Sequence, residues 1–126
     1  MGAAPKLDPA WPIIDSAKLK SIQDLSEPGD EDDFFKELLS IFFQRVPTLL
    51  AELETAVTGM NPLKLERSAH ALKGTSGNLG AMLMMKLAEQ LENTGRAGKL
   101  DNAAEVLAEL HTVYGLTKKE LETHWL

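Results

Sequence analysis

Apolar residues recur every three or four positions along most of this chain, and this spacing places them on one face of an α-helix. The longest such segment predicts a helix from about residue 31 to about residue 58, with acidic residues in its first turn. Its apolar face consists of Phe35, Leu38, Leu39, Phe42, Val46, Leu49, Leu50 and Leu53. Pro47 lies inside this segment. Because the periodicity continues beyond Pro47, we expect the helix to bend there and not to end.

A short helix is predicted before the long one, beginning after Asp15 or Ser16. Three apolar residues at helical spacing form its buried face: Leu19, Ile22 and Leu25. The sequence Glu27-Pro28-Gly29 then predicts a break, because proline and glycine interrupt regular structure.

Three more helices are predicted after the long one. Asn61-Pro62 suits the start of a helix that extends to about residue 79, since proline is favoured at the first helical position. The next helix is predicted at about 81–94, and a turn at 95–98 separates it from the last, which begins near Asp101 or Asn102. The apolar residues of these last two helices are Leu83, Leu87, Leu91, Val106, Leu107, Leu110, Tyr114 and Leu121.

Four substantial amphipathic helices with short connections predict an all-α fold, an antiparallel up-down-up-down four-helix bundle with a short extra N-terminal helix. A chain of 126 residues has room for one domain. We expect residues 1–12, with three prolines and little periodicity, to be a flexible tail and residues 13–126 to form the bundle domain.

The composition excludes several classes of protein. The absence of cysteine excludes disulfides, thiolate metal sites and thiol nucleophiles, and the net charge of −6 argues against nucleic acid as a partner. No apolar run approaches the ~20 residues that cross a bilayer, and the N-terminus resembles no secretory signal. Lys6 stands where a myristoylation motif requires Ser or Thr. We therefore expect a cytoplasmic, monomeric protein.

The residues that carry chemistry lie in the segment AHALKGTSGNLGA, residues 69–81. At about 100° per residue, His70 lies about 140° from the centre of the apolar stripe of its helix and should face outward. Lys73, Gly74 and Gly77 share this outward face. A glycine inside a helix costs about 1 kcal/mol relative to alanine, so two of them suggest that something approaches closely beside His70. The alternative interpretation of Gly74 and Gly77 is close packing between helices.

An exposed imidazole one turn from a lysine suits phosphoryl transfer. Neutral imidazole is nucleophilic near neutral pH, and an ammonium three residues further on can face the negative oxygens of a phosphoryl group. Phosphoryl transfer needs little beyond positioning and charge neutralisation. The sequence therefore predicts that His70 accepts a phosphoryl group, that Lys73 offsets its charge and that Gly74 provides clearance.

The same segment resembles the signature of histidine-containing phosphotransfer (HPt) domains: a histidine, then Lys73 and Gly74, and Gly80 at the end of the helix. With LENTGR at 91–96 and the helix pattern, the resemblance covers about residues 14–122. It implies reversible transfer between His70 and aspartates of receiver domains, in response regulators or a hybrid histidine kinase. It also implies that a Gln or Glu of the following helix, here Glu92, hydrogen-bonds the imidazole and leaves Nε2 free.

Receiver domains bind HPt modules through an apolar patch beside the histidine. The candidates here for partner binding are Leu63, Gly77, Arg96, Phe34 and Ile41. Two alternatives stay open: the first helix could simply cover Phe34 and Ile41, and Glu92 could form only an i,i+4 salt bridge with Arg96. The chain should need no cofactor of its own, and the resemblance implies that Mg²⁺ comes with the partner's receiver domain.

Two rival functions come from other classes. A di-metal enzyme in the bundle core would need Glu-x-x-His pairs, and the chain contains none. An adaptor with the same fold but without phosphorylation would be expected to lack the acceptor histidine. His70 is present at that position. No nucleotide-binding glycine loop occurs, so we expect no kinase activity. The sequence fits both a free-standing protein and the C-terminal module of a hybrid kinase.

Overall fold

The computed structural model describes residues 7–8, 10–25 and 34–126. These residues contain five helices and no strand. The helices are α1 (Ser16–Gln23), α2 (Phe34–Thr58), α3 (Pro62–Leu79), α4 (Met82–Ala97) and α5 (Ala103–His124). The predicted start of α2 near residue 31 lies outside the described residues, as does the predicted break at 27–29.

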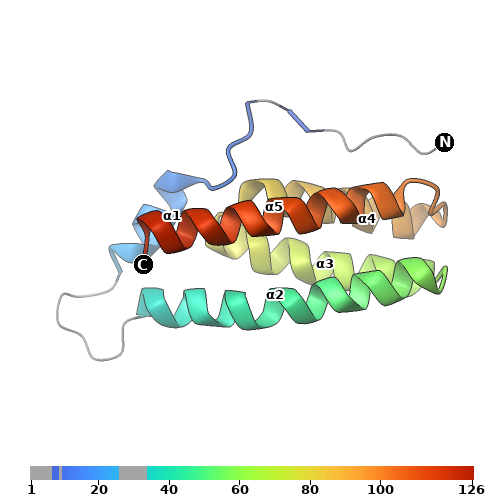
Figure 1. The fold of residues 1–126 in the computed structure, drawn as a ribbon, viewed down its shortest axis with the longest axis horizontal. Coiled ribbons are helices and arrows are strands. Elements are labelled where there is room, and N and C mark those ends of the chain that lie inside the picture. Colours follow the sequence, from blue (N-terminus) through green and yellow to red (C-terminus); the bar gives the residue numbers. More distant parts are fainter. Residues whose placement is uncertain (1–6, 9, 26–33) are drawn as a thin grey trace.

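Helices α2 to α5 run antiparallel along the long axis of the molecule, and α1 lies at the end where α3 passes into α4 (Figure 1). Each long helix packs against the next in sequence, and α5 returns against α2. This arrangement confirms the predicted four-helix bundle with an extra N-terminal helix. α2 continues through Pro47, and its later half is inclined to its first half in Figure 1. None of the described helices is long and apolar enough to cross a membrane.

Local capping explains several of the helix ends. The Asp15 carboxylate accepts a hydrogen bond from the backbone N–H of Lys18 at the start of α1, and the Asn61 side chain accepts one from Lys64 at the start of α3. Gly80 ends α3 with a φ of +87°, a left-handed conformation that favours glycine. The predicted starts of α1 and α3 and the end of α3 are therefore confirmed.

The turn predicted at residues 95–98 is wrong, because α4 continues to Ala97 and ends at Gly98 with a φ of +72°. Gly95 serves a different purpose. A Cβ on Gly95 would stand 2.6 Å from the backbone nitrogen of Glu66 and 2.7 Å from the carbonyl oxygen of Pro62. Glycine at this position therefore lets the backbones of α3 and α4 approach closely, and this helix pair makes the most extensive contact in the bundle.

Two other details differ from the sequence analysis. Leu25 follows the end of α1 and is exposed, because the helix stops at Gln23 and does not carry this side chain to the core. The buried stripe of α4 includes Met84, whereas Leu83 is only partly buried. The core otherwise contains the predicted apolar faces of α2 and α5, apart from the partly buried Leu38 and Tyr114.

Helix α1 is anchored to the C-terminal end of α3. The backbone N–H of Asp15 donates to the carbonyl oxygen of Gly80 at 2.7 Å, and the Lys18 ammonium donates to the carbonyl oxygen of Gly77 at 2.6 Å. The Gly77 carbonyl oxygen also accepts from the backbone N–H of Gly80 at 3.2 Å, so α1 is bound to carbonyl groups at the very end of α3. Trp11, which precedes α1, is also in contact with the bundle, because the Lys86 ammonium of α4 lies 5.1 Å from the centre of its ring. The division at residue 12 between tail and domain stays a prediction.

Replacing Gly95 with alanine tests the close approach of α3 and α4. We expect Gly95→Ala to lower the free energy of unfolding by about 2–3 kcal/mol, because its Cβ would collide with backbone atoms that cannot move independently. Gly115→Ala is the matched control: it lies in a helix with nothing within 4 Å of the added Cβ, and should raise the free energy by about 0.5–1 kcal/mol. Equal effects of the two changes in urea denaturation would contradict this account of Gly95.

Candidate functional site

Helix α3 presents His70 on the outside of the bundle. The His70 side chain is 71% exposed, which confirms the outward position predicted from the helical wheel. The opposite face of α3 is fully occupied by packing, because its buried residues are Leu65, Ser68, Ala69, Leu72, Ser76 and Leu79. The imidazole is therefore held on a rigid helix while its ring is open to a partner.

Glu92 of α4 is the residue that organises the site. One carboxylate oxygen, Oε2, makes a short hydrogen bond with Nδ1 of His70, and the other, Oε1, accepts from the Lys73 ammonium at 2.6 Å. Arg96 is more distant, with its Nη2 3.8 Å from Oε2. Glu92 therefore does not form only a salt bridge with Arg96, and its contact with Arg96 is weaker than those with His70 and Lys73.

Glu92 hydrogen-bonds the exposed imidazole, yet its own side chain is only 3% exposed. The reason is the close approach of α3 and α4 at Gly95, three residues further along α4, which brings the Glu92 carboxylate beneath the outward face of α3. A buried carboxylate is costly unless it is paired and hydrogen-bonded. His70 and Lys73 supply these partners, so the burial of Glu92 and the orientation of His70 depend on each other.

The hydrogen bond from Lys73 holds the pKa of Glu92 below its ordinary value of 4.5, against the opposing effect of burial, and the hydrogen bond with His70 acts in the same direction. Glu92 is thus a carboxylate near neutral pH and can only accept hydrogen bonds. Nδ1 of a neutral His70 must then carry the ring proton, and the lone pair is left on Nε2.

A hollow of about 360 Å³ lies beside the ring and is open to the surface. It is lined by Glu66, Arg67, His70, Glu92 and Arg96. Glu66 and Arg67 were not among the predicted site residues, although Arg67 precedes His70 by three residues, as Lys73 follows it by three. Within the described ranges, no cluster of His, Asp and Glu side chains is placed to hold a metal ion.

The two glycines of α3 have different surroundings. A Cβ on Gly74 would meet nothing within 4 Å, so this position is open as the prediction of clearance requires. A Cβ on Gly77 would stand 3.0 Å from the sulfur of Met85 on α4. For Gly77 the structure supports the alternative, close packing between helices, because its missing side chain faces α4 and not the surroundings of His70.

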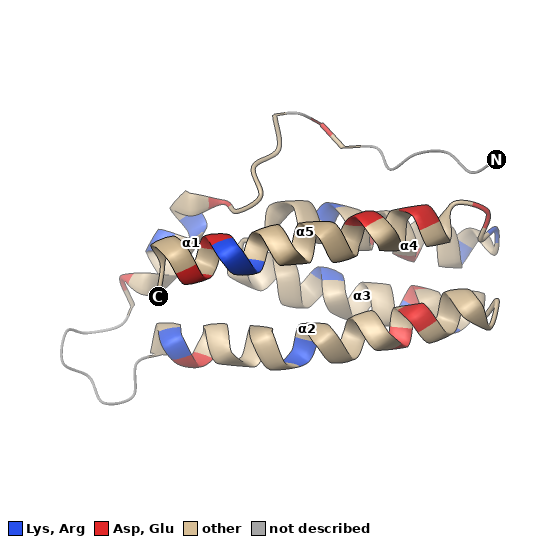
Figure 2. Cartoon of the chain, viewed as in Figure 1, with Lys and Arg blue, Asp and Glu red and all other residues tan. Residues whose placement is uncertain are grey.

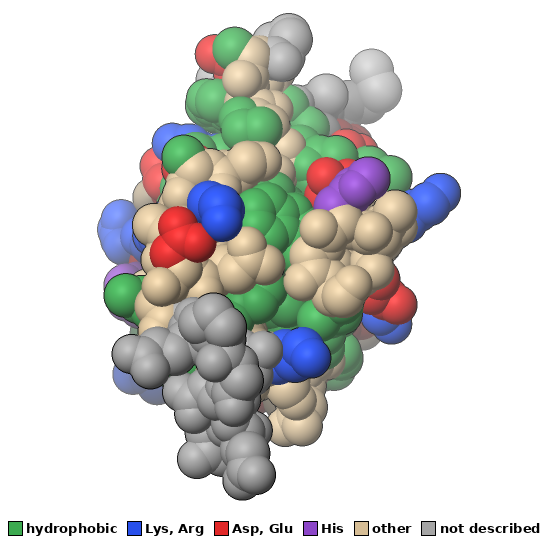
Figure 3. All heavy atoms as spheres, turned by 90° about the vertical axis from the view of Figure 1, so that its left-hand side faces the viewer, with side chains coloured by type: hydrophobic (Ala, Val, Ile, Leu, Met, Phe, Trp, Pro, Cys, Tyr) green, Lys and Arg blue, Asp and Glu red, His purple; other side chains and the backbone are tan. Residues whose placement is uncertain are grey.

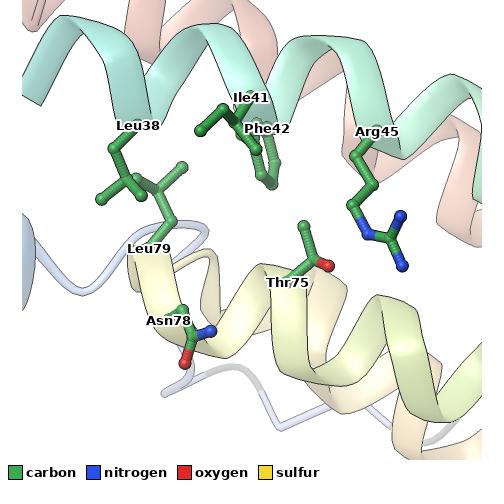
Figure 4. Close-up of a pocket in the computed structure, with 7 residues that line it drawn as sticks. All are labelled: Leu38, Ile41, Phe42, Arg45, Thr75, Asn78 and Leu79. Atoms are coloured by element: carbon green, nitrogen blue, oxygen red, sulfur yellow. The ribbon is translucent and has the colours of Figure 1, made fainter.

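The candidate docking residues are exposed. Phe34 is 48%, Ile41 50% and Leu63 55% exposed, so α1 does not cover Phe34 and Ile41 as the alternative held. Ile41 lines a shallow hollow of about 120 Å³ between α2 and α3 (Figure 4), together with Leu38, Phe42, Arg45, Thr75, Asn78 and Leu79. Hydrophobic side chains also reach the surface in the middle of the end face that carries α1 (Figure 3).

Helix α3, which carries His70, is basic in an acidic chain. α3 carries Lys64, Arg67 and Lys73 against one acidic residue, Glu66, which gives three minus one, or +2, whereas the whole chain has a net charge of −6. Acidic residues instead mark the later part of α2 and the first part of α5 (Figure 2). The helix that presents His70 is therefore suited to an anionic group or an acidic partner surface.

The other two histidines lack such an environment. Nε2 of His111 lies 3.4 Å from a carboxylate oxygen of Glu54, across α5 and α2. Nε2 of His124 lies 3.9 Å from a carboxylate oxygen of Glu120 on its own helix. In both, the carboxylate is exposed, unlike the buried carboxylate of Glu92 beside His70.

Fold and site together define a class of protein: a helical bundle that displays an oriented imidazole, with a cation beside it, on the outside of one helix. The sequence model of the Hpt domain matches residues 37–122, and the chain belongs to the Hpt domain family.

Relatives and solved structures agree with this assignment. The chain is 28% identical over 97 residues to multistep phosphorelay regulator 1 of Schizosaccharomyces pombe, covering 77% of this chain and 32% of that protein. The chain thus spans about a third of the length of this curated relative.

Among solved structures, it is similar to histidine-containing phosphotransfer protein B of Pseudomonas aeruginosa PAO1, with a TM-score of 0.80, 25% identity and coverage of 88% of this chain and 92% of that chain. It shares the fold of Saccharomyces cerevisiae Ypd1, solved in complex with the receiver domain of its downstream response regulator Ssk1. That comparison has a TM-score of 0.78 and 21% identity, covering 90% of this chain and 95% of that chain.

Replacing Lys73 with methionine tests the charge balance of the site. We expect Lys73→Met to raise the pKa of Glu92, because the largest influence lowering it is removed while burial remains. In the wild type the folded-state pKa lies below 4.5, so Glu92 contributes stability above about pH 4.5 that is lost as the pH falls through the folded-state value.

The pKa is measured from the ¹³C shift of the Glu92 carboxyl group during a pH titration. Lys86→Met serves as the control, since Lys86 is another lysine that contacts Trp11 and not Glu92. An unchanged Glu92 titration in Lys73→Met would show that Lys73 does not set its ionisation.

Proposed function

We propose that this chain is a phosphorelay intermediate in which His70 accepts a phosphoryl group from the aspartate of one receiver domain and donates it to the aspartate of another. The observation that carries the proposal is the hydrogen bond between Nδ1 of His70 and the buried Glu92 carboxylate. It leaves the Nε2 lone pair directed away from Glu92 on an exposed ring. Membership of the Hpt domain family supports the same chemistry.

The transfer between the partner's phosphoaspartate and His70 balances in atoms and electrons. The Nε2 lone pair forms a bond to phosphorus, the bond from phosphorus to the partner's aspartate oxygen breaks, and its electron pair leaves with the carboxylate. The ring becomes a phosphoimidazolium whose proton stays on Nδ1. The negative charge of Glu92 stabilises this cation, and reversal of the same steps returns the phosphoryl group to an aspartate.

The neighbouring residues take supporting roles. Lys73 holds Glu92 ionised and lies close enough to face the phosphoryl oxygens, while Gly74 leaves room for the partner's active site. The exposed apolar side chains of Phe34, Ile41 and Leu63 would contact the partner. Arg96, which lines the hollow beside His70, would lie near the same interface. The receiver domain bound to Ypd1 in a structure of the same fold supports a receiver domain as the partner here.

We further propose that the chain acts only as a carrier in the cytoplasm, without kinase activity of its own. It would bind no cofactor, and the Mg²⁺ that assists transfer would be held by the receiver domain. Phosphoryl transfer of this kind depends on positioning and electrostatic stabilisation more than on covalent machinery, so the sparse set of residues around His70 is sufficient.

Replacing His70 tests the proposal directly. We expect His70→Gln to abolish labelling by a ³²P-phosphorylated receiver domain, because the nucleophile is lost while an exposed position should leave the fold intact. His111→Gln and His124→Gln are matched controls that remove the other two histidines and should label like the wild type. The label on the wild type should be labile in acid and stable in base, as phosphohistidine is. Labelling of His70→Gln, or no labelling of the wild type by any receiver tested, would contradict the proposal.

A further inference from the structure

Arg67 is the cation beside His70 whose charge no other side chain among the described residues offsets. Across the described residues, no hydrogen bond or ion pair engages its guanidinium, although it lines the hollow that contains the His70 ring. The other cations at the site, Lys73 and Arg96, already have hydrogen-bond or ion-pair partners. Lys73 donates to Glu92 at 2.6 Å, and the Arg96 guanidinium donates to Asn93 at 3.3 Å while lying within 4 Å of both Glu66 and Glu92.

The helix places Arg67 and Lys73 on opposite flanks of His70. Arg67 precedes His70 by three residues and Lys73 follows it by three, so the two side chains project about 60° to either side of the imidazole. Lys73 is on the flank that meets α4, where it reaches Glu92. Arg67 is therefore on the other flank, one turn along α3, and a residue three positions away on a helix lies within side-chain reach.

A phosphoryl group on Nε2 would bring negative charge to a site in which the charge of Arg67 has no carboxylate partner within the described part of the chain. Two carboxylates, Glu66 and Glu92, line the hollow together with Arg67 and Arg96, so the charges of the lining residues sum to zero before any phosphoryl group arrives. Lys73, which donates to Glu92, and Arg96, which lies within 4 Å of Glu66 and Glu92, together balance the two carboxylates, so the positive charge that is left for an incoming anion is that of Arg67. A guanidinium presents two N–H groups side by side, in a geometry that matches two phosphoryl oxygens.

From these observations we infer that Arg67 binds the phosphoryl group on His70 Nε2, so that its guanidinium, and not the Lys73 ammonium alone, offsets the charge of the transferred group. The inference rests on the proposed function and adds a residue to it. It also assigns Lys73 mainly to Glu92, as the contact between them requires.

The test separates contact with the phosphoryl group from contact with a partner protein, by using phosphoramidate as a small donor that has no protein surface. We expect Arg67→Gln to slow loading of His70 by about tenfold from phosphoramidate and from a phosphorylated receiver domain alike, as loss of a charge-assisted hydrogen bond would. Arg67→Lys should recover part of the rate, since it restores the charge without the paired donors.

Lys118→Gln is the control for net charge. It removes one positive charge from an exposed position of α5, a helix that is not packed against α3. Its loading rate should equal that of the wild type, and equal slowing in Lys118→Gln and Arg67→Gln would overturn the inference in favour of a net-charge effect.

Slow loading of Arg67→Gln from the receiver domain alone would also overturn the inference, because Arg67 would then contact the partner and not the phosphoryl group. Failure of the wild type to load from either donor, with His70→Gln as the baseline, would instead contradict the proposed function. The two failures are therefore distinguishable.

Discussion

The Glu92 carboxylate is a negative charge held beneath the surface of the bundle, and both the orientation of His70 and the position of Lys73 depend on it. Burial of a charge is unfavourable unless its partners compensate, and here the partners are the side chains of His70 and Lys73 on the neighbouring helix. The close approach of α3 and α4 at Gly95 makes this contact possible. Packing at a glycine of α4 thus helps to place the carboxylate that orients an imidazole on the outside of the molecule.

The sequence predicts the helices well because each has a continuous apolar face and local signals at its ends. Asn61-Pro62 and Gly80 mark the limits of α3 in the sequence and in the structure. It does not predict where α4 ends, because glycine has two uses. At Gly98 it adopts a left-handed conformation that ends the helix, whereas at Gly95 it admits the backbone of α3. Only the position of a second helix distinguishes them.

The site was predictable to the extent that it lies on one helix. The outward position of His70 and the nearness of Lys73 follow from spacing along α3. The burial of Glu92, the packing of Gly77 on Met85 and the hollow beside the ring each require two helices, and a helical wheel describes only one. Arg67 lay within reach of the same spacing argument as Lys73. It was missed because the HPt resemblance directs attention to residues after the histidine.

The central claim is that Glu92 holds the proton on Nδ1 and leaves Nε2 of His70 as the atom that takes the phosphoryl group. Phosphorylated protein with ¹⁵N-labelled histidine tests this claim directly, because coupling between ³¹P and the ring nitrogens in NMR spectra identifies the bonded atom. The account predicts coupling to Nε2 of His70, with Nδ1 still protonated. A phosphoryl group on Nδ1, or on any residue other than His70, would contradict it.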